Sequence, residues 1–449
     1  MTLNRYSHVT PTSDGSQEEV GLANFAEKGI TTVPVNGAVL SASDTKVIIS
    51  AGEKSVVQPI TVEAAVPPAY ASTNPLANPN VSVAYGTDEA DAIDKLDKTV
   101  GVVGTKDETG LATIAWTIAD YDGDTAADYI ATGVLTLPDG WTGSPNDVTA
   151  EVMVSVFGGG NGSEVDPYLV ASAAQLNAVR NHLDQHFKQV REIDLADYQS
   201  GSGWVPIGSD TEPFSGSYNG DGHEIKNSKI SSDNNYIGLF GCTSSKAKIA
   251  GIKLVAVEVS GVCYVGGLVG RNCGIIENCS ATGDVTGSND SVGGLVGYNK
   301  WGTIETCYAT GAVTGSEHYV GGLVGSNNGG TIADGYATGK VEGQGAVGGL
   351  VGGNYDSIIE NCYATGSVTG DKWTGGLVGS NDFGAIENSY YDTDTTGMND
   401  TGKGIPKTTD EMKAGLSNDN IYTGWDTATI WTIEEGHYPW LKWQGAPLD

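Results

Sequence analysis

Short apolar runs recur at a nearly constant interval through the middle of the chain. Successive copies start 27 or 28 residues apart, and each run is bounded by glycine or asparagine. The pentapeptide Gly-Gly-Leu-Val-Gly begins at Gly266, Gly293, Gly321, Gly348 and Gly375, after a looser copy at Gly238. Because no helical spacing links the runs, the pattern predicts stacked coils of short β-strands.

Alternation along these strands predicts which residues face inward. If side chains point in and out by turns, equivalent residues of successive coils form apolar columns. The predicted columns are Leu268/Leu295/Leu323/Leu350/Leu377, Ile276/Ile304/Ile332/Ile359/Ile386, Ala281/Ala309/Ala337/Ala364 and Val285/Val313/Val341/Val368. A polar column follows the motif glycines, at Asn272, Asn299, Asn327, Asn354 and Asn381. Its amides are predicted to bond from coil to coil and so satisfy groups in a turn.

The chain is therefore predicted to be all-β, with a parallel β-helix as its main body. About three short strands are expected in each coil of about 27 residues, with each strand ~4.8 Å from its copy. A right-handed solenoid is favoured because parallel crossovers are overwhelmingly right-handed.

Both ends of the solenoid are expected to be covered, since an open end exposes apolar side chains and unpaired backbone. Leu176, Val179 and Leu183 lie at helical spacing after a cap at Ser172, which predicts a helical lid. A second short helix is predicted after Thr408. Four tryptophans are predicted to seal the last coil, in preference to forming a sugar site: Trp425, Trp431, Trp440 and Trp443.

The part before the solenoid has a different pattern. Alternating runs near residues 81, 111, 129 and 148, around a central Trp116, predict an immunoglobulin-like β-sandwich without a cysteine pair. The predicted organisation is a β segment of unclear fold (1–66), a linker (67–80), the sandwich (81–157), the cap and first coils (158–235), the repeats (236–391) and a C-terminal cap (392–449).

The repeat also resembles a known motif. Gly-Gly-Leu-Val-Gly followed by Tyr-Ala-Thr-Gly is similar to the GLUG motif of bacterial IgA-peptidase ectodomains and other large surface and adhesin-like proteins. The resemblance extends over roughly residues 166–443, through Asp166-Pro-Tyr-Leu-Val and Tyr438-Pro-Trp-Leu. It implies a surface location and no catalytic residues. The His-Glu-x-x-His sequence of zinc peptidases does not occur among the six histidines.

Composition and charge agree with a turn-rich β protein. Glycine accounts for 65 of 449 residues, and the net charge is −32. This charge argues against nucleic acid and anionic membranes as partners. No apolar run is long enough to span a membrane, and the first residues do not form a signal peptide. Because the resemblance implies a location outside the cell, we expect the chain to be a segment of a larger exported, cell-surface protein.

One outward column is the candidate binding site. Tyr308, Tyr336, Tyr363 and Tyr390 occupy the same repeat position, one residue after a column of small inward residues. Such a strip is predicted to hold sugar rings or a partner protein, or else to form a self-stabilising ladder.

The remaining polar candidates favour structural roles. Cys279, Cys307 and Cys362 share an inward position and are predicted to be buried thiols. Two of the other three, Cys242, Cys263 and Cys273, could form a disulfide. No cysteine has zinc-ligand spacing with histidine. The sequence from Asp120 to Asp124, with Asp128, lacks the calcium-loop pattern. An outward glutamate column is expected at Glu277, Glu305, Glu360 and Glu387. Neither a metal nor a cofactor is predicted.

Three functional classes follow. The first is a non-catalytic extracellular structural or adhesin-like protein whose solenoid is a rod or binding face for glycans or surface proteins. The second is a polysaccharide lyase or hydrolase, which needs carboxylates or basic residues that break the repeat. The third is a self-associating subunit of an extracellular filament or sheath. The recurrence of the acidic positions from coil to coil favours the first class.

Overall fold

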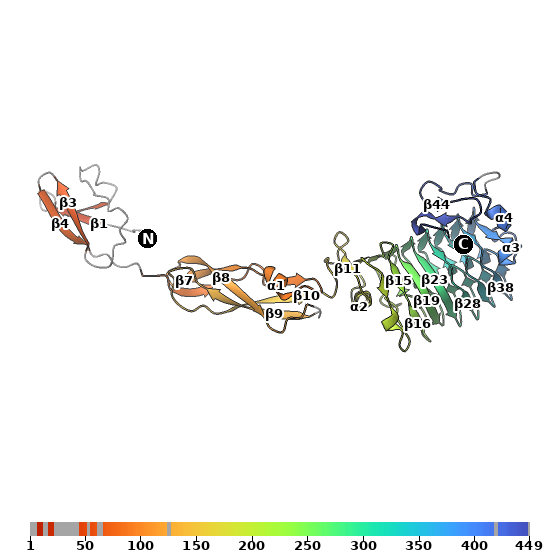
Figure 1. Ribbon diagram of the computed structural model, residues 1–449, viewed down its shortest axis with the longest axis horizontal. Coiled ribbons are helices and arrows are strands. Elements are labelled where there is room, and N and C mark those ends of the chain that lie inside the picture. The colour runs from red at the N-terminus through yellow and green to blue at the C-terminus, as the bar shows by residue number, and fades with distance from the viewer. Residues whose placement is uncertain are drawn as a thin grey trace. The chain divides into compact units, whose positions relative to one another are not determined.

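The computed structural model describes residues 66–123, 127–416 and 421–447, together with four earlier strands whose backbone pairing is defined (Figure 1). These strands form two antiparallel pairs, β1(Ser7–Pro11) with β2(Gln17–Gly21) and β3(Thr45–Ala51) with β4(Lys54–Ile60). The two strands predicted in this segment are β3 and β4. The prediction for the packing of residues 1–66 lies outside the described residues.

Residues 66–157 contain one six-stranded sheet in the order β5-β7-β8-β9-β10-β6. The elements are β5(Tyr70–Thr73), β6(Asn80–Val83), α1(Glu89–Asp94), β7(Thr99–Gly104), β8(Thr109–Ile118), β9(Asp128–Thr136) and β10(Val148–Val154). Strand β8 alternates between exposed and buried side chains, as its sequence pattern predicts. Trp116 lies in its buried face and donates a hydrogen bond from Nε1 to the carbonyl of Asp97 at 2.7 Å.

One prediction for this region is not confirmed, and a second needs correction. The strands pair in a single continuous sheet, so the predicted two-sheet immunoglobulin-like sandwich is not confirmed. The predicted linker contains strand β5, which pairs with β7, and two of its four residues, Tyr70 and Thr73, are good strand formers. Strand β7 and helix α1 were not predicted, since their runs are short.

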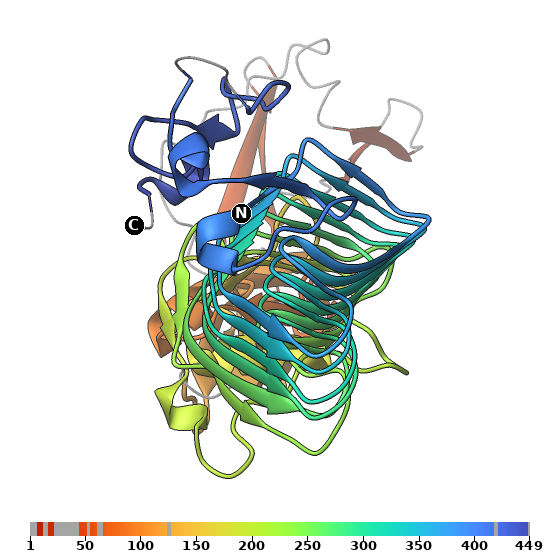
Figure 2. The same ribbon diagram turned by 90° about the vertical axis from the view of Figure 1, so that its right-hand side faces the viewer.

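The second half of the chain is a parallel β-solenoid, as predicted (Figure 2). Sheet 1 has nine strands: β11(Tyr168–Val170), β12(His186–Gln189), β14(Ser217–Asn219), β18(Lys248–Ala250), β22(Ile275–Glu277), β26(Thr303–Glu305), β31(Thr331–Ala333), β36(Ile358–Glu360) and β41(Ala385–Glu387). Sheet 2 contains β13(Ile193–Asp194), β15(Glu224–Lys226), β16(Lys229–Ser231), β19(Lys253–Gly261), β23(Ser280–Gly287), β27(Tyr308–Ala309), β28(Val313–Gly315), β32(Tyr336–Ala337), β33(Val341–Gly343), β37(Tyr363–Ala364), β38(Val368–Gly370), β42(Tyr390–Asp392) and β43(Ile405–Lys407).

Two further sheets complete each coil. Sheet 3 is formed by β17(Phe240–Cys242), β21(Val269–Asn272), β25(Val296–Lys300), β30(Val324–Asn328), β35(Val351–Tyr355) and β40(Val378–Asp382). Sheet 4 is formed by β20(Val265–Gly266), β24(Val292–Gly293), β29(Val320–Gly321), β34(Val347–Gly348) and β39(Thr374–Gly375). A coil such as residues 292–315 thus has five short strands where three were predicted, because the motif glycines and the Thr-Gly step interrupt the pairing.

The predicted columns form the core. Leu295 donates its N–H to the carbonyl of Leu323 at 3.0 Å, and Leu323 donates to Leu350 at 2.9 Å. Every residue of the leucine, isoleucine, alanine and valine columns is buried except Ile386, which is partly buried in the last coil. The asparagine ladder is also confirmed, since each amide from Asn272 to Asn354 donates to the next side-chain oxygen at 2.8–3.0 Å.

Helices occupy the first and last coils. At the start, α2(Ala173–Ala178) follows its cap Ser172, which accepts a hydrogen bond from the Gln175 N–H, and Leu176 and Val179 pack into the solenoid core. The predicted helical lid is therefore present. The remaining elements are the 3₁₀ turns η2(Val179–Asn181), η3(Ala196–Tyr198) and η4(Lys442–Gln444), helices α3(Thr393–Thr396) and α4(Thr409–Met412), and the hairpin β44(Trp431–Thr432) with β45(Trp440–Leu441).

Candidate functional site

The four tyrosines predicted to share an outward column do so. In-register pairing of β27, β32, β37 and β42 places the four residues in one column along sheet 2. The rings of Tyr308 and Tyr336, and of Tyr336 and Tyr363, are separated by 4.9 Å between centroids and are inclined by only 5° and 6°. We call Tyr308, Tyr336, Tyr363 and Tyr390 the tyrosine ladder.

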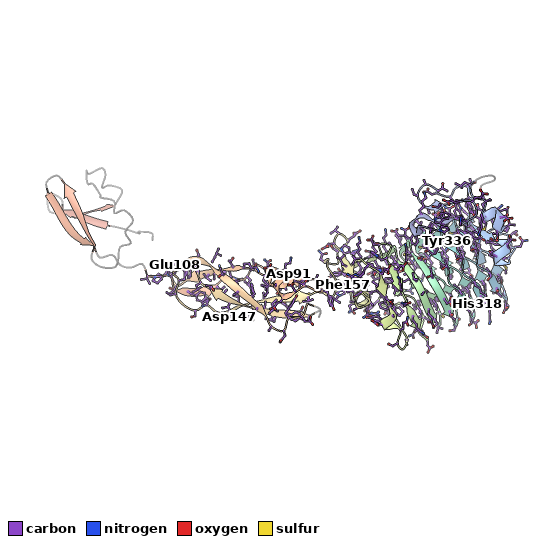
Figure 3. All side chains as sticks on the ribbon, viewed as in Figure 1. Asp91, Glu108, Asp147, Phe157, His318 and Tyr336 are labelled. Atoms are coloured by element: carbon purple, nitrogen blue, oxygen red, sulfur yellow. The ribbon has the colours of Figure 1, made fainter. Side chains whose placement is uncertain are left out.

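The expectation that the ladder faces solvent is wrong. Its side chains are only 1–7% exposed, because residues 421–447, which we call the C-terminal strap, cover them (Figures 1 and 3). Trp443 stacks on Tyr308 at 5.5 Å, and Trp431 packs against Tyr336 and Tyr363 at 6.3 and 6.1 Å. The aromatic strip therefore binds a segment of its own chain, and these residues offer no open face for sugars or a partner.

Tyrosine hydroxyl groups fix the strap from the solenoid side. Tyr336 donates to Oε1 of Gln444 at 2.7 Å, and Tyr363 donates to the carbonyl of Pro439 at 2.6 Å. Tyr390 donates to the carbonyl of Ile421. Burial raises the pKa of Tyr363 and Tyr390, so these hydroxyl groups stay protonated and remain donors.

Indole groups fix the strap from the other side. Trp425 and Trp443 donate to the carbonyls of Asn388 and Thr306 at 3.0 and 2.8 Å. Trp431 donates to Oδ1 of Asp334 at 2.8 Å. The three acceptor residues occupy equivalent repeat positions, each with a left-handed backbone, at Thr306 (φ 52°), Asp334 (φ 50°) and Asn388 (φ 44°). The strap thus contacts a row of turn residues as well as the ladder.

Asp334 is the one carboxylate in this row. The equivalent positions on other coils hold asparagine or threonine, including Asn278, Thr306 and Asn361. Asp334 is 6% exposed, and burial raises the pKa of its carboxyl group, while hydrogen bonds from Trp431 and Asn361 oppose the shift. An ionisable side chain whose charged form is disfavoured by burial therefore lies at the strap interface.

The tryptophans do not seal the last coil, contrary to the prediction. The loop between α3 and β43 does so. Gly376 donates its N–H to Oδ1 of Asp400 at 2.8 Å, Lys403 donates from Nζ to the carbonyl of Gly379 at 2.6 Å, and Tyr391 is fully buried against the core. Trp425, Trp431 and Trp443 instead cover the side of sheet 2, where they pack against the tyrosine ladder.

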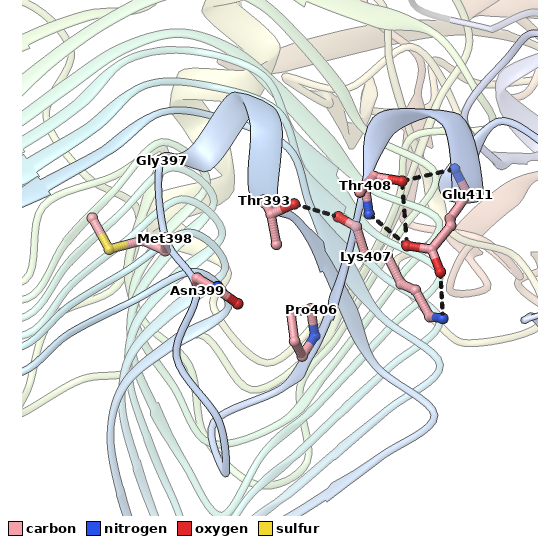
Figure 4. A pocket seen from close by; sticks show the side chains of 8 residues that line it. All are labelled: Thr393, Gly397, Met398, Asn399, Pro406, Lys407, Thr408 and Glu411. Atoms are coloured by element: carbon pink, nitrogen blue, oxygen red, sulfur yellow. Dashed lines mark hydrogen bonds and ion pairs between the residues drawn. The ribbon is translucent and has the colours of Figure 1, made fainter.

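A depression of about 490 Å³ lies beside this seal (Figure 4). Its lining includes Thr393, Lys407, Thr408 and Glu411. Lys407 pairs with Oε1 of Glu411 at 2.9 Å, and Glu411 also accepts the Thr408 N–H as part of a capping box. Both charged groups thus have structural partners.

The cysteines are structural. All six are free thiols, so the possible disulfide among Cys242, Cys263 and Cys273 is not formed. Cys279, Cys307 and Cys362 are buried, and each Sγ lies 3.1–3.2 Å from the carbonyl oxygen two residues earlier. Burial raises the pKa of Cys307 and Cys362, which opposes formation of a reactive thiolate.

The acidic columns point outward as predicted. Glu277, Glu305, Glu360 and Glu387 lie at one repeat position on sheet 1 and are partly or fully exposed, with Ala333 in place of glutamate on β31. Glu277 pairs with Lys248 at 2.8 Å. Within the described part of the chain, no group of three or more histidine, cysteine or acidic side chains has a metal-binding arrangement. Asp124 lies outside the described residues.

Comparison with known proteins identifies the repeat. The GLUG motif matches residues 261–286, 288–314, 316–342 and 343–369. A Gly-rich membrane protein of Evansella cellulosilytica is 42% identical over 134 residues, which cover 28% of this chain and 16% of that protein. Halomucin of Haloquadratum walsbyi is 32% identical over 198 residues, which cover 41% of this chain and 2% of that protein.

A solved structure named IgA1 Protease aligns with 69% of this chain and 26% of its own length, at 16% identity and a TM-score of 0.39. The chain thus spans only a small share of the proteins it matches. The fold defines the class as a parallel β-solenoid built from repeats. The repeats within residues 261–369 match the GLUG motif.

Proposed function

We propose that this chain is a non-catalytic, extracellular module of a cell-surface protein, in which the solenoid is a stiff support for exposed side chains. The supporting observation is the strict register of equivalent residues from coil to coil. Valine, leucine, asparagine and tyrosine each stack on their own copies, so residues at one repeat position line up along the solenoid. Repetition of this kind serves a rod or an extended contact surface, whereas hydrolysis of a sugar chain needs carboxylates in two different environments.

The relatives' names support a surface location. One is named a membrane protein and the other halomucin, and neither name is that of an enzyme. Among the described residues the longest helices have six residues, and none has the length and hydropathy of a membrane-crossing helix.

Surface labelling tests the location. Antibodies raised against residues 158–447 are expected to label intact cells of the source organism as strongly as permeabilised cells, and external protease is expected to remove the signal. Labelling that requires permeabilisation would overturn the location. The purified chain is also expected to release no new reducing ends or unsaturated sugars from a panel of polysaccharides. A product that accumulates with enzyme concentration would refute the non-catalytic role.

A further inference from the structure

A second group of stacked tyrosines lies outside the strap. Tyr236 and Tyr264 precede the paired residues Ile237 and Val265, and Tyr298 lies on strand β25 of sheet 3. Their ring centroids are 5.0 and 5.2 Å apart, with interplanar angles of 13° and 29°. All three side chains are partly exposed. We call Tyr236, Tyr264 and Tyr298 the open tyrosine row.

The ring faces of Tyr236 and Tyr264 are already occupied. Tyr264 has Tyr236 on one side and Tyr298 on the other, and the guanidinium of Arg271 lies 5.1 Å from the ring centroid of Tyr236. A sugar ring binds an aromatic residue mainly by lying flat on an uncovered face, so this arrangement is poorly suited to stacking of a glycan. Ring edges and hydroxyl groups remain at the surface. No described residue forms a hydrogen bond with the hydroxyl group of Tyr264 or Tyr298.

The tyrosine ladder shows what such edges and hydroxyl groups bind on this solenoid. Its rings are stacked at 4.9 Å, close to the spacing in the open row. Its hydroxyl groups donate to the carbonyls of Pro439 and Ile421 and to the side chain of Gln444. Strap indoles and tyrosines cover the remaining ring surface. A polypeptide segment with aromatic side chains, here a turn-rich one with a short hairpin, therefore satisfies a stacked tyrosine row of this spacing.

The charged groups beside the open tyrosine row indicate which charge a bound partner segment should carry. Asp210 is paired with Arg271, so this cation is already compensated. Asp290 lies near Tyr264, and its buried Oδ1 atom has no hydrogen-bond partner among the described residues. The whole chain carries a net charge of −32. A basic segment is attracted by this field, whereas an acidic segment is repelled.

We propose that the open tyrosine row docks a polypeptide segment of a partner protein that carries aromatic and basic residues. This inference rests on the proposed surface function, since it gives the solenoid a ligand. Docking is measured on the purified chain, so a failure to bind would refute the docking site and say nothing against the surface location. Intracellular labelling would refute the surface location and say nothing against the docking site.

Fluorescence anisotropy with the intact chain tests the proposal. The probe is a labelled twelve-residue peptide that alternates tryptophan and lysine, at 150 mM NaCl. We expect saturable binding that weakens by about 10-fold, or about 1.4 kcal/mol, in the double variant Tyr264→Ala, Tyr298→Ala. The conservative pair Tyr264→Phe, Tyr298→Phe keeps the rings and is expected to lose about 3-fold through the hydroxyl groups alone. Phe383→Ala, a side chain 94% exposed on the last coil, is the matched control and is expected to bind like the parent chain.

Several outcomes would overturn the proposal. Binding that is unchanged in both double variants would place the peptide elsewhere. If a peptide that alternates tryptophan and glutamate bound equally well, basic residues in the partner would not be required. Competition by cellohexaose or maltohexaose that depends on Tyr264 and Tyr298 would make the row a glycan site instead. Circular dichroism of each variant shows whether the solenoid has kept its structure, and the phenylalanine pair provides a test even where the alanine pair does not fold.

Discussion

Each leucine of the central column is held by its own copies on the coils above and below. Leu323 is fully buried and is bonded through its backbone to Leu295 and Leu350. Its neighbour Gly335 occupies the position that holds cysteine on three other coils, and a carbon added at Gly335 would lie 3.3 Å from Leu323 Cδ2. This part of the core therefore has no larger side chain that could move in to fill a void.

We expect Leu323→Ala to lower the free energy of unfolding by roughly 2–5 kcal/mol, since it removes buried methyl groups and leaves a cavity. The measurement is urea unfolding followed by circular dichroism, with the change read from the midpoint at constant slope. Ile358→Ala is the control, because this side chain is 43% exposed, and it is expected to cost less than about 1 kcal/mol. Equal losses in the two variants would contradict the assignment of the core.

Asp334 is expected to make the stability of the folded chain depend on pH. Because burial raises the pKa of this carboxyl group in the folded state, the folded chain binds a proton more tightly than the unfolded chain. Its contribution to the free energy of unfolding is therefore most favourable below the unfolded pKa and falls as the pH rises through the folded pKa. Asp334→Asn keeps an oxygen for the Trp431 indole and removes the charge.

We expect Asp334→Asn to unfold at a higher temperature than the parent chain at pH 7, and this advantage to shrink as the pH is lowered below the folded pKa of Asp334. Thermal melts at pH 7 and at acidic pH provide the measurement. Glu387→Gln, an exposed carboxylate on the last coil, is the comparison and is expected to leave the melting curves nearly unchanged. A lower melting temperature for Asp334→Asn at pH 7 would show that the charge itself stabilises the strap.

At the scale of elements, the strap is a separate structural layer on sheet 2. Trp431 is fully buried and contacts Tyr336, Tyr363 and Trp425.

We expect Trp431→Ala to cost about 3–5 kcal/mol of strap docking, since it leaves a large void beneath the hairpin. Hydrogen exchange should then accelerate across residues 421–447 while the asparagine ladder stays protected. Trp301→Ala, with a side chain 69% exposed, is the matched control. Parallel loss of protection in the strap and the inner coils would mean that the two form one cooperative unit.

The sequence predicts the coils well because their information is local and repeated. Leu295 and Leu323 are one period apart, so their stacking follows from the spacing of the motif. The strap is different, since its hydrogen bonds join Trp431 to Asp334 and Trp443 to Thr306 across 97 and 137 residues. Its tryptophans were recognised as a covering group, but nothing in their spacing indicates which surface they cover. The open tyrosine row was missed because Tyr298 belongs to a different repeat column from Tyr236 and Tyr264.

At the scale of the whole molecule, the excess of acidic side chains acts against compaction. Asp and Glu number 55 against 23 Lys and Arg, and in-register strands place some carboxylates one coil apart. This repulsion extends over the Debye length, which is about 30 Å at 10 mM salt and about 10 Å at 100 mM. Adding salt therefore weakens repulsion between many charges at once, while the few surface ion pairs lose little.

We expect the melting temperature of the chain to rise by several degrees between 10 and 300 mM NaCl, because screening relieves self-repulsion more in the folded state than in the extended unfolded chain. Scanning calorimetry provides the measurement, with choline chloride at equal ionic strength as the control for the identity of the cation. If screening is the cause, the two salts give the same shift. A much larger shift with NaCl would require specific sodium binding, and a fall with both salts would mean that attractive ion pairs, such as Lys248 with Glu277, outweigh the repulsion between carboxylates.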